Sequence, residues 1–67
     1  MKHCRGVVWK YRNSPARGIT WAAELTTGNS LLCAYGQKHL KSAISIANKM
    51  AKTLNWKRVG HWHGKKV

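Results

Sequence analysis

The sequence predicts an α+β domain in which a three-stranded antiparallel sheet packs on one C-terminal amphipathic helix, in the order β-β-β-α. Residues 38–54 have the 3.6-residue apolar period of a helix. Residues 5–12 and 19–26 alternate in the manner of strands and are rich in β-branched and aromatic side chains. Thr27-Gly28-Asn29 is a hairpin signal, and the apolar segment 30–35 follows it.

The predicted helix has two contrasting faces. One face is apolar and contains Leu40, Ala43, Ile44, Ala47, Met50, Ala51 and Leu54. The opposite face is basic and contains Lys38, Lys41, Lys49 and Lys52. An isolated helix of this length is marginal in water, so we expect its apolar face to cover the sheet. The lysine face is either a solvated back or a second surface for phosphates.

Side chains alternate between the two faces of a strand, so each strand offers an apolar set to the helix. We expect the core face to contain Val7, Trp9, Tyr11, Ile19, Trp21, Ala23, Leu25, Leu31, Cys33 and Tyr35. The open face is then expected to contain Lys10, Arg12, Thr20, Ala22 and Glu24. A turn with Pro15 and Gly18 separates the first two strands.

We divide the chain into a β-β-β-α domain at residues 1–55 and a basic tail containing Trp and His at residues 56–67. The tail contains Lys57, Arg58, Lys65 and Lys66. Two alternatives stay open for it: a short fourth strand around residues 56–59, or a tail that orders on binding.

Charge is the strongest indication of a partner. The 67 residues include 13 Lys and Arg but a single acid, Glu24, for a net charge of +12. A polyanion would relieve the resulting self-repulsion, so duplex DNA is the first expected partner, with RNA or an acidic protein as alternatives. We see neither a signal peptide nor a membrane-spanning run, and expect a cytoplasmic protein with no membrane partner.

The residue types give catalysis little support. The chain has no Asp, and one Glu cannot form a carboxylate pair. We therefore expect no enzymatic activity and no cofactor. A zinc site is an alternative for the Cys and His residues, but their spacing matches no common ligand pattern: His3, Cys4, Cys33, His39, His61 and His63. We favour two reduced thiols, with Cys33 as a small buried hydrophobe.

The four tryptophans fall into two groups. Trp9 and Trp21 lie on the predicted core face, where a structural role is favoured. Trp56 and Trp62 alternate with Lys, Arg and His, which is typical of a stacking platform for single strands. The second pair is also suited to cap the open end of a small core.

Two local sequences resemble a known family. Arg5-Gly6-Val7 opens the first strand, and Trp21-Ala22-Ala23-Glu24-Leu25 forms the second. Together with the third strand and the Ala-rich helix, residues 5–54 resemble the APETALA/ethylene-responsive-factor type of DNA-binding domain. The amino-terminal arm-binding domain of tyrosine-type phage integrases is similar in its β-β-β-α order.

The resemblance implies that the sheet lies in the major groove of DNA with the helix behind it. Arg5 would contact a base or a phosphate, and Glu24 would face the groove. The resemblance also implies a core position for Val7, Trp21, Ala23 and Leu25.

We interpret the chain as a small basic DNA-binding protein of a phage or mobile element, which contacts duplex DNA with the open face of its sheet. The predicted contact residues are Arg5, Lys10, Arg12, Arg17, Thr20, Glu24, Lys57 and Arg58. Two other functions stay open: a phage-type inhibitor or adaptor that docks on an acidic protein, and an RNA or single-strand binder.

Overall fold

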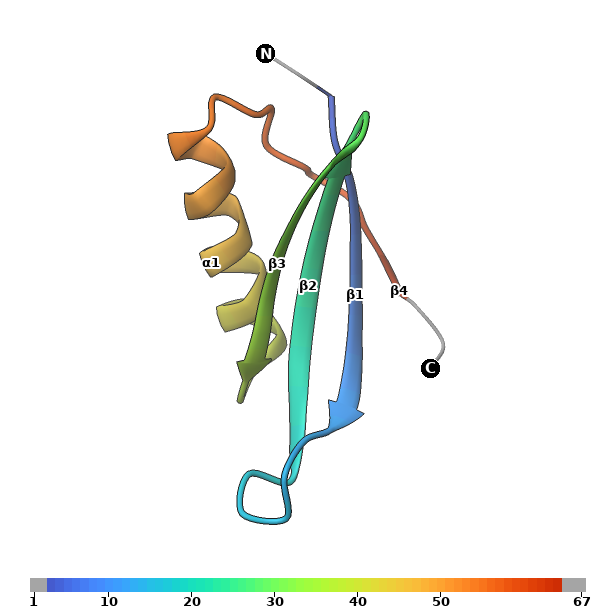
Figure 1. The fold of residues 1–67 in the computed structure, drawn as a ribbon, viewed down its shortest axis with the longest axis vertical. Helices are drawn as coiled ribbons and strands as arrows, with labels where there is room; N and C mark the ends of the chain where they lie inside the picture. Colours follow the sequence, from blue (N-terminus) through green and yellow to red (C-terminus); the bar gives the residue numbers. More distant parts are fainter. Residues whose placement is uncertain (1–2, 65–67) are drawn as a thin grey trace.

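The α+β class is confirmed by the computed structural model, which describes residues 3–64. The elements follow one another as β1 (Arg5–Arg12), β2 (Ile19–Thr27), β3 (Ser30–Gln37), α1 (Leu40–Thr53) and β4 (Trp62–Gly64) (Figure 1). The first four elements have the expected order and begin or end within two residues of the expected bounds.

The sheet has four strands rather than three, in the order β3-β2-β1-β4. β1 pairs antiparallel with β2, β2 pairs antiparallel with β3, and β4 pairs parallel with β1. The prediction of a three-stranded sheet with a C-terminal helix is therefore wrong, since α1 is followed by a strand, which lies at Trp62–Gly64 rather than around residues 56–59. A three-residue strand is too short to show alternation, and its parallel pairing joins residues far apart in sequence.

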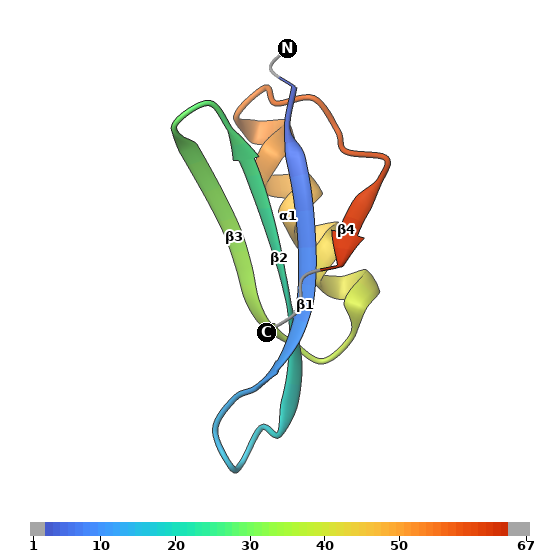
Figure 2. The same cartoon turned by 90° about the vertical axis from the view of Figure 1, so that its right-hand side faces the viewer.

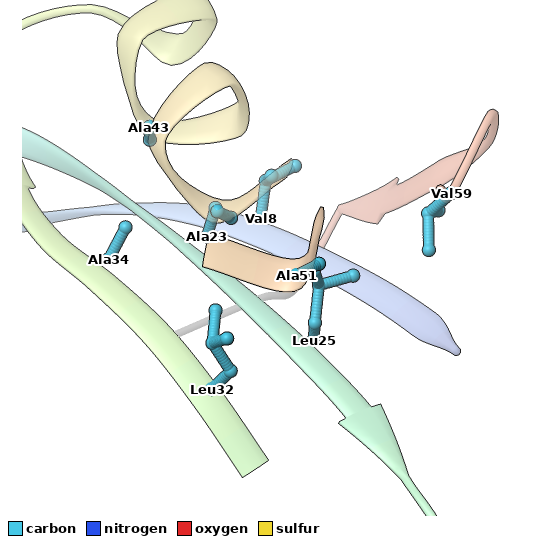
Figure 3. Packing of buried hydrophobic residues seen from close by; sticks show 9 residues of the cluster. Val8, Ala23, Leu25, Leu32, Ala34, Ala43, Ala51 and Val59 are labelled. Carbon is cyan, nitrogen blue, oxygen red and sulfur yellow. The ribbon is translucent and has the colours of Figure 1, made fainter. Parts of the chain in front are cut away.

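The helix lies on one side of the sheet and leaves the other side open (Figures 1 and 2). It packs on β2 and β3 through Ala43, Ala47 and Ala51, which are all buried. The sheet residues of the same cluster are Val8, Ala23, Leu25, Leu32 and Ala34, and Val59 joins it from the connection between α1 and β4 (Figure 3). Within residues 3–64, Leu25 is the largest fully buried side chain, so the core is built mostly from small residues.

The buried face of α1 is narrower than the 3.6-residue apolar period predicts. Ala43, Ala47 and Ala51 are inside as expected, whereas Met50 is 40% exposed and Leu54 is 55% exposed. The helix starts after His39, which makes no capping bond with its side chain, as the lack of Ser, Thr, Asp or Asn there indicates. No helix in residues 3–64 is long and apolar enough to cross a lipid bilayer.

Candidate nucleic-acid interface

The inward and outward faces of two strands are reversed relative to the prediction. β2 is as expected, with Ala23 and Leu25 in the core. In β1 the core residue is Val8, and in β3 the core residues are Leu32 and Ala34. By alternation, the open face receives the sets predicted to be buried: Val7, Trp9 and Tyr11 from β1, and Leu31, Cys33 and Tyr35 from β3. The core position that the resemblance implied for Val7 is also wrong.

The alanines of α1 explain this reversal. A helix that presents alanine approaches a sheet closely, and interiors are packed without voids. A layer of Trp and Tyr rings would hold α1 away from the sheet, whereas Val8, Leu32 and Ala34 fit the thin interface. The rings of Trp9, Tyr11 and Tyr35 therefore lie on the uncovered side, whereas the half-buried Trp21 packs against the core on the helix side.

The open face carries a cluster of rings. The Trp9 and Tyr35 rings meet edge to face, with centroids 6.0 Å apart and planes at 67°. Ala22 pairs with Trp9 and is 0% exposed, although it does not belong to the core beneath α1. Side chains of the open face therefore cover this part of β2, while Tyr35 itself stays 54% exposed.

A hydrogen-bonded chain runs across the open face from β3 to β2. The Tyr35 hydroxyl donates to Cys33 Sγ at 3.2 Å, and the Cys33 thiol donates to Glu24 Oε2 at 3.8 Å. The hydrogen bond to Cys33 is the main reason that the pKa of Tyr35 rises to about 12, and desolvation and the nearby Cys33, Glu24 and Tyr11 add to it. Glu24 thus lies on the open face as expected, but a thiol of the same chain engages its carboxylate.

A bulge in β3 shapes one end of this face. The register shifts between Trp21 and Ala23, so Tyr35 and Gly36 together oppose Ala22. Gly36 has φ +71°, and a Cβ there would lie 3.0 Å from Arg17 Nη1 and 4.0 Å from Tyr11 Oη. Arg17 therefore folds back from the β1–β2 turn over the end of the sheet.

Arg17 helps to form a pocket of about 300 Å³, here called the sheet-end pocket, lined by Ala16, Arg17, Thr20, Gly36 and Lys38. Two of these five residues, Arg17 and Lys38, are cationic. Thr20 is only 3% exposed, and its Oγ1 accepts a hydrogen bond from Asn13 Nδ2 at 3.5 Å. Thr20 is thus mainly part of the frame of the pocket.

Lys10 and Arg12 do not lie on the open face, contrary to the prediction. The Lys10 ammonium lies 5.9 Å from the centroid of the Trp21 ring, and Trp21 packs against the core on the helix side. Arg12 is two residues from Lys10 along β1, so its side chain points to the same, helix side of the sheet. It pairs with Ile19 at the end of β1. Among the predicted contact residues on the strands, Arg5 is the cation whose side chain points to the open face, and it is exposed.

A second concentration of charge lies on the helix side. A groove of about 420 Å³, here called the helix groove, is lined by Lys41, Ile44, Ser45, Asn48, Lys49, Lys52 and Arg58. Four of these side chains are cations, and none is acidic. Asn48 Oδ1 is buried and has no hydrogen-bond partner among residues 3–64. Of the predicted contact residues, Arg58 lines this groove, and Lys57 precedes it in the chain and is exposed.

Trp56 and Trp62 pack against the core, as the capping role requires. Both are half-buried and pack against the core cluster. Val59 between them is buried, so residues 56–64 are packed on the domain. Lys65 and Lys66 lie outside the described residues.

The cysteines and histidines form no ligand set in the part of the chain that is described. His61 and His63 stack edge to face with centroids 4.7 Å apart, as their alternation suggests. Across residues 3–64, however, no three His, Cys, Asp or Glu side chains come close enough to hold a metal ion. The zinc alternative therefore has no site in these residues.

The aromatic cluster on the open face is the feature that sequence patterning missed. Its signal was the spacing of Ala43, Ala47 and Ala51, which indicates a thin helix–sheet interface. Comparison with family models, curated proteins and solved structures gives no match to this chain.

Proposed function

We propose that this protein binds DNA by placing the phosphates of a duplex against the helix groove. The observation that carries the proposal is the gathering of Lys41, Lys49, Lys52 and Arg58 around one groove. Glu24 is the sole acid of the chain and has open-face parity, so its carboxylate offsets little of this charge. Lys and Arg side chains that neutralise phosphates release condensed counterions, which supplies most of non-specific affinity.

This proposal moves the duplex contact from the sheet to the helix. Since Lys10 and Arg12 have helix-side parity, the middle of the open face is occupied mainly by apolar and aromatic groups. Such a surface attracts few phosphates. Arg58 and Lys57 keep the role predicted for them, and the lysine face of the helix becomes a main contact surface rather than a secondary one.

Salt-dependent binding of a labelled duplex tests the proposal. The logarithm of the binding constant should fall linearly with the logarithm of salt concentration, with a slope of about −0.9 for each phosphate contacted. Lys49→Ala and Lys52→Ala should each weaken binding and reduce the size of the slope by about one. Lys10→Ala removes the same charge outside the groove and is the matched control.

Three results would contradict this function. A slope near zero would show that phosphates contribute little, and an equal effect of Lys10→Ala and Lys52→Ala would show that the groove is not the contact. Equal affinity for polyglutamate and duplex DNA would point instead to an acidic protein as the partner.

A further inference from the structure

We propose that the open face of the sheet is a second binding surface, on which unpaired nucleotides of a single strand stack. This inference rests on the proposed function in one respect: it assumes that the cationic chain attracts nucleic acid. The surface is independent of the helix groove because that groove is lined mainly by residues of α1, and α1 lies on the other side of the sheet (Figure 2).

The Trp9 and Tyr35 rings on this face are held in place by their contacts, so that a base can stack on an exposed ring. Tyr35 is 54% exposed, and the edge of one ring in the Trp9–Tyr35 pair faces the other. The hydrogen bond from Tyr35 to Cys33 further fixes the phenol ring. A base that stacks on a ring already held in place loses less affinity to ordering of the side chain.

Cations border the two ends of the ring cluster. Arg5 is exposed at the start of β1, and Arg17 and Lys38 line the sheet-end pocket at the other end. The distance along β1 from Arg5 to Tyr11 is about 20 Å, at about 3.3 Å per residue. A short single strand that lies along this line would have phosphates near each end and bases over the rings between them.

The charge and chemistry of the face favour a single strand over other occupants. A second copy of this chain would bring two net charges of +12 together, which opposes a symmetric face-to-face dimer. In a duplex the bases already stack on one another, so their faces are not offered to Tyr35. Unpaired bases present those faces, and every base has one.

Binding of labelled oligo(dT) to the full chain tests this inference. Tyr35→Ala should weaken the affinity by about 5- to 150-fold, the range equivalent to loss of one base–aromatic stack. Tyr35→Phe keeps the ring and should retain most of the affinity. Leu31→Ala is the matched control because Leu31 is 59% exposed on the same face of the same strand but has no ring. A parallel series with oligo(rU) identifies the preferred sugar.

Three results would overturn the inference. They are an unchanged oligo(dT) affinity in Tyr35→Ala, an equal loss in Leu31→Ala, and a self-association that Tyr35→Ala abolishes while oligo(dT) binding persists. Thermal melting of each variant shows whether the domain is still folded. If only this inference is wrong, Lys52→Ala still weakens duplex binding. If only the helix groove is not the duplex site, Tyr35→Ala still weakens oligo(dT) binding.

Discussion

Trp62 lies directly against Gly6: a Cβ on residue 6 would fall 2.7 Å from Trp62 Cε3. The two residues are partners in the parallel pairing of β4 with β1. Since ordinary contacts of a Cβ are longer than 3.4 Å, the fourth strand reaches the sheet because residue 6 has no side chain. The Arg5-Gly6-Val7 sequence thus has a structural role that its resemblance to a DNA-binding family does not indicate.

Gly6→Ala should destabilise the fold by about 1–3 kcal/mol, because the methyl group must displace the Trp62 ring or shift β4. Urea unfolding followed by tryptophan fluorescence measures this change. Gly64→Ala is the control in β4, since a Cβ there meets nothing within 4 Å, and should change the free energy of unfolding by less than about 0.5 kcal/mol. Equal effects of the two substitutions would contradict the close contact.

Ala47→Leu should cost about 1–3 kcal/mol of unfolding free energy, because the thin layer between α1 and the sheet has no room for a larger side chain. Ala47 is 0% exposed. Ser45→Leu adds a similar side chain at an exposed position of the same helix and should have little effect on stability. A neutral or stabilising Ala47→Leu would show that the interface is loosely packed.

Tyr35 should ionise near pH 12 rather than near its ordinary pKa of 10. Cys33→Ala removes the hydrogen-bond acceptor and should lower the pKa toward 10, as followed by phenolate absorbance. Tyr35→Phe identifies which transition belongs to this residue. Because the pKa is raised in the folded state, the associated stability is fully present below pH 10 and is lost as the pH rises through about 12. An unchanged titration in Cys33→Ala would contradict the bond.

Added salt should raise the melting temperature. The chain has a net charge of +12 and a single acidic residue. Attraction between opposite charges therefore offsets little of the repulsion among the cations. Raising the ionic strength from about 0.01 M to about 0.15 M shortens the Debye length from about 30 Å to about 8 Å and screens that repulsion. Thermal unfolding followed by circular dichroism measures the effect. A melting temperature that falls with salt would show that attractive pairs outweigh repulsion.

The positions of the three long strands and the helix could be predicted from the sequence because their signals are local. Gly28 marks the β2–β3 turn, the alternation in residues 5–12 and 19–26 marks strands, and the 3.6-residue period of residues 38–54 marks α1. The division of each strand into two side-chain sets was also predictable. The net charge and the near absence of acids follow from composition alone.

The tertiary structure decided which set of each strand faces the helix, and this determines the candidate sites. Alternation places Val8 and Trp9 on opposite faces of β1 but does not say which one is buried. The volume available beneath Ala43, Ala47 and Ala51 decides this, because it has room for Val8 and not for a Trp ring. It places the rings of Trp9 and Tyr35 outside and Lys10 on the helix side. The pairing of β4 with β1 was equally beyond a local pattern, because it depends on Gly6 and Trp62 meeting across most of the chain.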